Sequence, residues 1–216
     1  MSLNGVDWSA SGSEFSYYEE PEISSIFPTI GPVEGGTEIF FLGKNFFNQT
    51  MAGEFLCMFT PINVKLPPRR IPAVYHNSTA LVCPSPGGWG QGIAVKVQVT
   101  FNGMNYDNNN FTFTFYSITR AFPQSGPSDG TGNDIIIEGF GFRNDTNPMC
   151  RLDNVTSQPT YVSWRQIRCQ MTRAREGSDY FGTVDFAVTP NGNDWHPFSA
   201  GFHYYPQPQI FGITPK

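Results

Sequence analysis

The chain repeats itself, and this repetition restricts its possible folds more than any other feature. NGVDW at 4–8 returns as NGMNY at 102–106 and as NGNDW at 191–195. An aromatic cluster begins ten residues after each glycine of this phrase, with FSYY at 15–18, FTFY at 113–116 and FHYY at 202–205. A phrase that recurs with its surroundings indicates one structural unit used several times.

Two further phrases keep the same period. ISSIFPTIGPVEGG at 23–36 matches ITRAFPQSGPSDGT at 118–131, and IFGITP begins at 210. IFFLGKNFFNQT at 39–50 matches IIIEGFGFRNDT at 135–146. The first of these phrases begins a repeat, whereas NG-x-x-W and its aromatic cluster end one.

These phrases divide the chain into four parts. We predict the C-terminal hairpin of a preceding repeat at 1–21 and two whole repeats at 22–116 and 117–206. The first strand of a following repeat is predicted at 207–216. A lone hairpin buries little apolar surface, so we expect Trp8, Phe15 and Tyr17 to be covered by another repeat or another subunit.

Alternating apolar and polar residues within each repeat predict half-buried β-strands. The alternation runs over 93–101 and 111–115, and over 184–188 in the second repeat. The Asn102-Gly103 pair is typical of a type I′ turn, whose two central residues both have positive φ. Six to eight such strands per repeat predict an all-β fold of tandem immunoglobulin-like sandwiches in a linear array.

Composition agrees with this fold and excludes some partners. The chain has 22 Gly and 18 Pro, and only 14% of its residues are charged. Its net charge of −5 has the wrong sign for neutralising phosphates, so we expect no nucleic-acid partner. No apolar run approaches the ~20 residues that cross a bilayer, so no membrane span is expected in this segment. Residues 1–20 do not resemble a secretory signal, and any export signal is expected to lie outside the 216 residues.

The four cysteines occupy matching positions, two in each repeat: Cys57 and Cys83, then Cys150 and Cys169. Of the three possible pairings, only one disulfide within each repeat respects the period. Such bonds would stabilise each sandwich and indicate an oxidising compartment. Four buried free thiols remain the alternative. Zinc is disfavoured, because no C-x₂-C spacing occurs and the three histidines are scattered.

Five asparagines fit the N-x-S/T signal for N-linked glycosylation: Asn48, Asn77, Asn110, Asn144 and Asn154. Asn48 and Asn144 occupy the same position of the two repeats, five residues after Gly43 and Gly139. We expect glycans on these two first. The alternative is that such asparagines only supply turn geometry and local hydrogen bonds.

The repeated phrases resemble a known family, the IPT/TIG domains. The resemblance rests on the opening phrase at 23–37, the G-x-x-F turns at 43–46 and 139–142, the CPSP motif at 83–86 and the closing NG-x-x-Y/W phrase. It implies immunoglobulin-like sandwiches, as in plexins, Met-type receptors and other surface proteins. Rel-type transcription factors and some starch-acting enzymes also contain such domains. The family shares a fold and no common chemistry, so function depends on what decorates the fold.

No catalytic or cofactor motif occurs, and we expect neither an enzyme nor a metal site. His196 and His203 are interpreted as surface residues. The recurring aromatics Trp8, Tyr106 and Trp195 are candidates for packing between successive repeats. They could instead bind sugar or pack over their own hairpins.

The expected function is therefore structural. We predict a glycoprotein segment of an extracellular filament, stalk or surface coat, because two to four residues between repeats leave little room for bending. Its expected partners are neighbouring repeats or identical subunits in a fibre, with a protein or glycan ligand as a further possibility. The alternatives are a ligand-binding or adhesive ectodomain of a cell-surface receptor, and accessory domains of a secreted carbohydrate-active enzyme.

Overall fold

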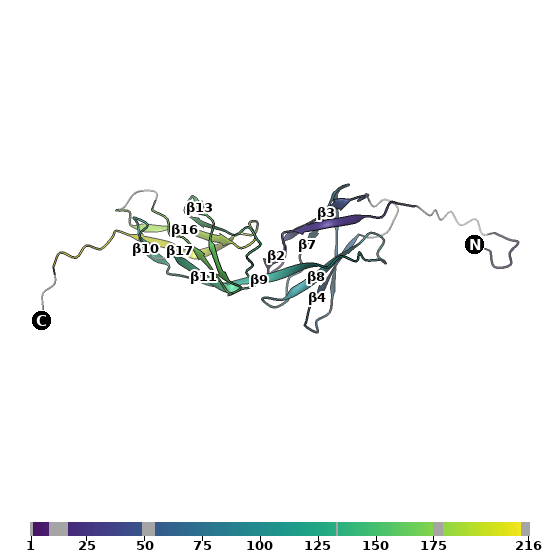
Figure 1. Cartoon of the computed structure of the whole chain (residues 1–216), viewed down its shortest axis with the longest axis horizontal. Helices are drawn as coiled ribbons and strands as arrows, with labels where there is room; N and C mark the ends of the chain where they lie inside the picture. Colours follow the sequence, from purple (N-terminus) through teal and green to yellow (C-terminus); the bar gives the residue numbers. More distant parts are fainter. Residues whose placement is uncertain (1, 9–16, 49–54, 133, 175–178, 213–216) are drawn as a thin grey trace.

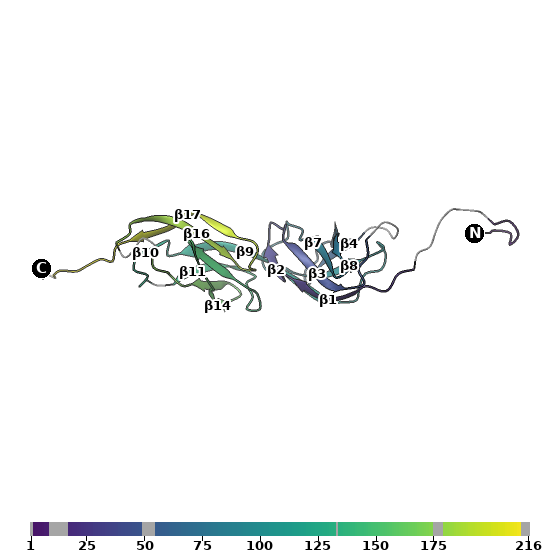
Figure 2. The same cartoon turned by 90° about the horizontal axis from the view of Figure 1, so that it is seen from above.

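The computed structural model describes residues 2–8, 17–48, 55–132, 134–174 and 179–212. These residues form seventeen β-strands and no helix. Two β-sandwiches lie one after the other along the long axis, and the two ends of the chain point away from each other (Figure 1, Figure 2). The predicted all-β fold of tandem sandwiches is therefore confirmed.

The first domain packs two sheets face to face. One sheet has the order β1 (Glu22–Phe27), β3 (Glu38–Lys44), β7 (Ala80–Pro84) and β6 (Val74–Asn77). Each strand of this sheet is antiparallel to its neighbours. The other sheet contains β2 (Ile30–Pro32), the first half of β9 (Phe111–Phe122), β8 (Ala94–Thr100), β4 (Leu56–Pro61) and β5 (Arg69–Pro72).

The second domain repeats this plan. One sheet contains the second half of β9, β11 (Ile135–Phe140), β15 (Gln166–Cys169) and β14 (Thr160–Ser163). The other contains β10 (Ser125–Pro127), β17 (His196–Tyr205), β16 (Gly182–Thr189), β12 (Met149–Leu152) and β13 (Val155–Ser157). Matching strands therefore have matching partners in the two domains.

Each domain has nine strand segments rather than the predicted six to eight. One reason is that the opening strand changes sheets: β1 pairs with β3, whereas β2 pairs with β9 in the opposite sheet. Pro28 lies between β1 and β2, and a proline has no backbone N–H to donate to a ladder. The second domain makes the same change between the end of β9 and β10, with Pro123 at the break.

The predicted alternation places the core between the sheets. Val95, Val97 and Val99 of β8 are fully buried, and so are Phe113 and Phe115 of β9. Burying a side chain of this size stabilises a fold by roughly 1.5–3 kcal/mol. Each domain has its own buried apolar cluster on these positions.

The predicted type I′ turn at Asn102-Gly103 is wrong. Only Gly103 has a positive φ, of 75°. The side chain of Asn102 shapes the turn instead, because its Oδ1 accepts hydrogen bonds from the backbone N–H groups of Met104 and Asn105 at 3.0 and 2.9 Å. An asparagine that binds its own backbone two residues on is a common alternative way to make a turn.

The segments outside the two domains are described only in part. Residues 2–8, 17–21 and 207–212 form no strand, whereas 9–16 and 213–216, which the predicted hairpin and opening strand also include, lie outside the described residues. Trp8 is 75% exposed, and Phe15 lies outside the described residues. A hairpin or strand without the rest of its sheet buries too little apolar surface to be stable in water.

Candidate functional site at the junction between the domains

The two domains share a strand and have no linker. The first half of β9 pairs with β8 and β2 of the first domain, through Phe111–Tyr116. The second half pairs with β11 of the second domain, from Ser117 to Phe122. The expected short connection around Ser117 therefore lies inside one continuous strand, which pairs with a sheet of each domain in turn.

The turn between β16 and β17 reaches back to the first domain. Asn191 makes the same turn as Asn102, because its Oδ1 accepts from the N–H groups of Asn193 and Asp194 at 3.1 and 2.9 Å. Asn4 repeats this pattern with Val6 and Asp7. The recurring NG phrase thus specifies a turn that uses the asparagine Oδ1 as acceptor and leaves the Nδ2 group to donate to other partners.

In the second domain this amide group crosses the junction. Asn191 Nδ2 donates to the carbonyl oxygen of Ile30 at 2.9 Å and to Asp194 Oδ2 at 2.7 Å. The same carboxylate oxygen accepts a hydrogen bond from Thr37 Oγ1 of the first domain at 2.7 Å. Asn191 and Thr37 are each 1% exposed. Buried polar groups that satisfy one another in this way fix one relative position of the domains, because any shift would leave them unpaired.

Apolar contacts accompany these hydrogen bonds. Ile30 of the first domain is fully buried within the apolar cluster of the second. Tyr116 joins the same cluster at 3% exposure, and its hydroxyl donates to the carbonyl oxygen of Asp194 at 3.4 Å. Burial raises the pKa of Tyr116, and the negative charges of Asp194 and Glu34 raise this pKa further. The junction therefore keeps this hydroxyl neutral.

A second set of contacts forms beside Ser117. Its hydroxyl donates to Gln91 Oε1 of the first domain at 2.7 Å. The ring of Trp164, in the turn between β14 and β15, lies close to Gly92, since a Cβ placed there would be 3.7 Å from Trp164 Cζ3. The two domains thus also touch where β9 passes from one to the other.

The recurring aromatics make none of the junction contacts described above, and Trp195 agrees better with the alternative of packing within its own domain. Trp195 packs on its own domain, with the Arg151 guanidinium 4.9 Å from its ring centre. The Arg70 guanidinium lies 6.0 Å from the ring centre of Tyr106, and Trp8 is exposed. Asn191 and Asp194 of the same phrase make the junction contacts, together with Ile30, Thr37 and Trp164, which sequence reasoning missed. The recurrence of polar residues at positions one and four of the phrase was the available signal.

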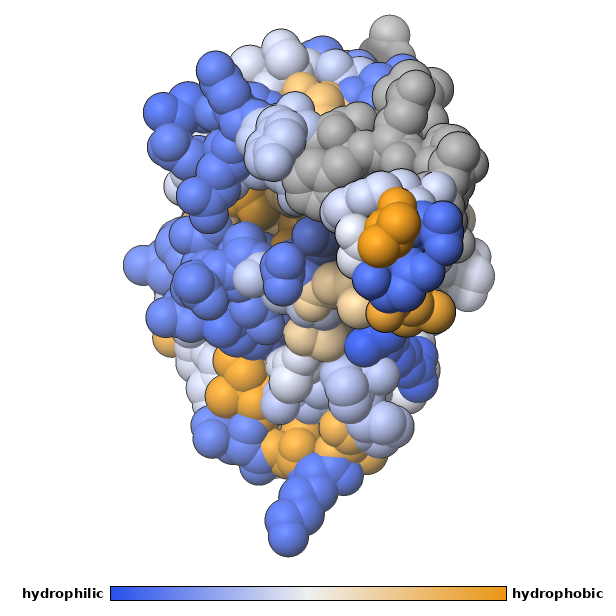
Figure 3. All heavy atoms as spheres, turned by 90° about the vertical axis from the view of Figure 1, so that its right-hand side faces the viewer, coloured by the Kyte–Doolittle hydropathy of each residue, from blue (hydrophilic) through white to orange (hydrophobic). Residues whose placement is uncertain are grey.

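The turn at Asn102, at the opposite end of the first domain, is the counterpart of the Asn191 turn at the junction. Asn102, Asn105 and Tyr106 line a cavity of about 720 Å³ together with the incoming segment Tyr18 to Ile23. Asn102 is half-buried and Asn105 is exposed, unlike the buried Asn191. Figure 3 looks onto this end of the molecule, where hydrophobic patches lie among hydrophilic residues.

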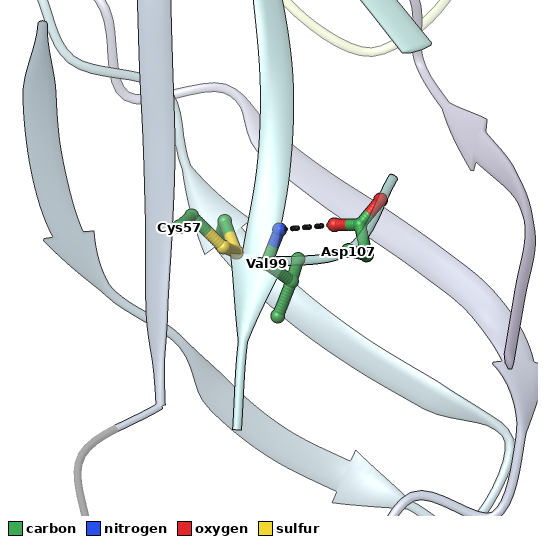
Figure 4. Close-up of a disulfide and its surroundings, with 4 residues drawn as sticks. Cys57, Val99 and Asp107 are labelled. Atoms are coloured by element: carbon green, nitrogen blue, oxygen red, sulfur yellow. Dashed lines mark hydrogen bonds between the residues drawn. A yellow bond between two sulfur atoms is a disulfide. The ribbon is translucent and has the colours of Figure 1, made fainter. Parts of the chain in front are cut away.

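The cysteines form the predicted disulfides, Cys57–Cys83 and Cys150–Cys169, and leave no free cysteine. Each bond joins the two sheets of its own domain, from β4 to β7 and from β12 to β15. In the first domain the loop after β8 closes beside this bond, because Asp107 accepts a hydrogen bond from the N–H of Val99, which pairs with Cys57 (Figure 4). Structural disulfides of this kind are typical of oxidising compartments.

The five asparagines of the glycosylation signals, Asn48, Asn77, Asn110, Asn144 and Asn154, are all exposed. An enzyme could therefore reach each of them on the folded surface. Gln49 and Thr50, which complete the signal of Asn48, lie outside the described residues. Occupancy by glycans stays a prediction.

Within the described ranges, no group of three or more His, Cys, Asp or Glu side chains could hold a metal ion. In the same part of the chain, no helix has the length and hydrophobicity that a membrane crossing requires.

An aromatic and arginine surface lies on the outer face of the second domain. The Arg165 guanidinium lies 4.7 Å from the ring centres of both Phe140 and Trp164, and these rings are 5.6 Å apart. Arg120 stacks on Phe122 at 4.8 Å. Trp164 is 50% exposed. Exposed aromatic and arginine side chains are enriched where proteins bind one another.

The fold defines a class of proteins, namely tandem, disulfide-bonded immunoglobulin-like sandwiches. Residues 21–113 and 117–204 each match the IPT/TIG domain, and the chain therefore belongs to the IPT/TIG domain family. These matches cover nearly all of both observed domains, as the sequence resemblance predicted.

Two plexins are among the similar proteins. Plexin-B3 of Mus musculus is 32% identical over 130 residues, which are 55% of this chain and 6% of plexin-B3. A solved structure of the full extracellular region of plexin A4 has a TM-score of 0.50 and 19% identity, over 100% of this chain and 18% of that one. A second plexin A4 structure has a TM-score of 0.44 and 18% identity, over 94% of this chain and 20% of that one. The chain thus spans a small part of these relatives, and the structural likeness supports the fold alone.

Proposed function

We propose that this chain is a non-catalytic structural segment of an extracellular filament, stalk or surface coat, in which each domain pair acts as a stiff spacer. The observation that carries the proposal is the continuous strand β9, which belongs to a sheet of each domain. Bending at this junction would break strand pairing and the buried contacts of Asn191 and Thr37. Domains joined through a mobile linker would have neither feature.

The extracellular location is supported by three observations. Both domains carry a disulfide, and five glycosylation signals have exposed asparagines. The plexin A4 structure with a TM-score of 0.50 is of a full extracellular region. We infer a secreted or cell-surface glycoprotein whose covalent groups are N-linked glycans and which needs no cofactor.

The stiffness can be tested by interrupting β9. Insertion of Gly-Ser-Gly between Ser117 and Ile118 should broaden the distance distribution from small-angle X-ray scattering and reduce its maximum dimension, because the strand could no longer run through both sheets. The same insertion after Asn108, in the loop before β9, is the matched control and should leave the distribution unchanged. Identical scattering from both variants would contradict the proposal.

The exposed aromatic and arginine surface favours a second candidate function, a ligand-binding ectodomain. The observation that favours it is the Arg165 guanidinium, which stacks on both Phe140 and the half-exposed Trp164. A protein or glycan ligand would be the partner. Trp164 also approaches Gly92, so Arg120→Ala is the cleaner variant, and it should weaken adhesion to cells or glycan arrays without changing stability if this surface binds a ligand.

A further inference from the structure

A row of four apolar side chains crosses the outer face of the first domain. Phe27 of β1 pairs with Phe40 of β3, Phe40 pairs with Val82 of β7, and Val82 pairs with Val74 of β6. Neighbouring positions Ile39 and Leu81 face the core and are fully buried, so the row faces outward. Phe27 is 48% exposed and Val74 is 59% exposed. We call these four residues the apolar row.

The corresponding row of the second domain is not fully apolar. It runs from Phe122 to Ile136, then to Arg168 and Thr160. Polar side chains on the outer face are the usual pattern for a sandwich. A wholly apolar row across a sheet is instead a surface that gains stability when something covers it.

One loop of the second domain comes close to this row. The loop between β11 and β12 carries Asn144, Asp145 and Thr146, which form one of the two glycosylation signals at matching positions. Arg143 Nε donates to Asp145 Oδ1 at 2.7 Å, and Thr146 Oγ1 donates to the carbonyl oxygen of Arg143 at 3.1 Å. These bonds close the loop into a compact turn, on which Asn144 is exposed.

The loop and the start of the row share a cavity at the junction. This cavity has a volume of about 360 Å³. Its walls are Ile26, Phe27, Pro28 and Thr29 of the first domain, with Asp145, Thr146, Asn147 and Asn191 of the second. Asp145, the residue after Asn144, therefore lines the same cavity as Phe27, and a glycan on the exposed Asn144 would start close to this end of the row.

The size and chemistry of an N-linked glycan fit the row. Three strand spacings of about 4.8 Å make the row roughly 14 Å long, which is the length of a few sugar rings. A hexose ring presents C–H groups on one face, and these pack well on the electron-rich face of an aromatic ring. Its hydroxyl groups would remain in water, so the cover adds no unpaired polar group.

We propose that the glycan of Asn144 lies across the apolar row of the first domain and so bridges the two domains from outside. The proposal rests on the proposed function, because it requires a chain that is exported and glycosylated. A glycan attached to one domain and packed on the other would restrict bending, in addition to the buried contacts of Asn191 and Thr37.

The test uses the protein secreted from a eukaryotic cell line, with Asn144→Gln and Asn154→Gln as a matched pair. Asn154 belongs to the same domain but lies at the far end of β12 from the Asn144 loop. Hydrogen exchange of the amides in β1 and β3 should be faster in Asn144→Gln, by at least roughly threefold. Asn154→Gln should exchange like the unchanged protein. Phe27→Ser should abolish the difference between glycosylated and Asn144→Gln protein, because the first contact of the glycan would be gone.

Glycopeptide mass spectrometry distinguishes failure of this proposal from failure of the proposed function. If Asn144 carries no glycan while other signals do, this proposal alone is overturned. It is also overturned if Asn144 carries a glycan but Asn144→Gln changes hydrogen exchange no more than Asn154→Gln does. A secreted chain without any glycan would overturn the glycoprotein part of the proposed function as well. A glycosylated protein that is dimeric, and becomes monomeric with Phe27→Ser, would show that a second copy covers the row instead.

Discussion

The same turn occurs at Asn102 and at Asn191, but only the Asn191 turn packs against another domain. Both asparagines accept hydrogen bonds from the backbone two and three residues on. Asn191 is 1% exposed and binds Ile30 of the first domain, whereas Asn102 is half-buried. The local sequence thus determines the turn, and the facing domain determines what the turn binds.

The equivalent surfaces of the two domains, which would each contact such a turn, also differ in burial. Ile30 and Tyr116 form the receiving surface at the junction and are buried there. Ser125 and Tyr205 hold the same positions in the second domain, where Ser125 is exposed and Tyr205 is half-buried. The family fold is constant, while burial at these positions depends on a neighbour.

The largest effect is expected from Ile30→Ala. Its side chain fills the cluster of the second domain from outside, so its removal should cost roughly 2–4 kcal/mol of unfolding free energy. Ser125→Ala is the control at the equivalent exposed position and should change stability by less than about 0.5 kcal/mol. Urea unfolding followed by tryptophan fluorescence measures both. Equal effects would mean that the junction does not bury Ile30.

Asn191→Ala should cost somewhat less, about 2–3 kcal/mol, because the turn and the bonds to Ile30 and Asp194 are lost together. Asn102→Ala removes only the turn bonds and should cost about 0.5–1.5 kcal/mol. Thermal unfolding of the two variants measures the difference. If Asn102→Ala were as damaging as Asn191→Ala, the contacts across the junction would contribute nothing.

Alkaline pH should weaken the junction through Tyr116. Burial raises its pKa in the folded state, so the folded protein holds the proton more tightly than the unfolded chain. Its contribution is fully present below the unfolded pKa near 10 and is lost as pH rises further, at about 1.4 kcal/mol per pH unit. Tyr116→Phe should flatten the fall in stability above pH 10, as measured by urea unfolding at several pH values. The same slope with and without this substitution would refute the role of Tyr116.

The smallest expected effect is the coupling of Thr37 to Asp194. A double-mutant cycle of Thr37→Val and Asp194→Ala should give a coupling free energy of about 1 kcal/mol, since the two side chains share a buried hydrogen bond. The same cycle with Asn105→Ala, the counterpart of Asp194 at the other end of the first domain, should give no coupling. Chemical denaturation of the single and double variants measures both cycles.

Much of this architecture could be predicted from the sequence, because it depends on local patterns. Recurring phrases predicted two sandwiches, alternation predicted β8 and β9, and matching cysteine positions predicted both disulfides. These features need only the period and the side-chain direction along a strand. The family assignment followed from the same phrases.

The junction was predicted only in part, because its contacts join residues far apart in sequence. The closing phrase did mark the site, but its aromatic Trp195 packs on Arg151 within its own domain. Asn191 meets Ile30 across 161 positions of sequence, and no pattern in either repeat identifies that pair. The continuity of β9 was also missed, since a change of strand partners at Ser117 leaves no mark in the alternation of residues.

The distance distribution between one label on each domain tests the rigid junction most directly. Spin labels would be placed at the exposed Met104 and Phe181 through unnatural amino acids, which leave the disulfides intact. Pulsed electron paramagnetic resonance would then measure the distance between the two labels. We expect one narrow distribution, as narrow as that of a pair within the second domain at Val155 and Phe181. Asn191→Ala combined with Thr37→Val should broaden it. A broad distribution in the unchanged protein would contradict a rigid junction.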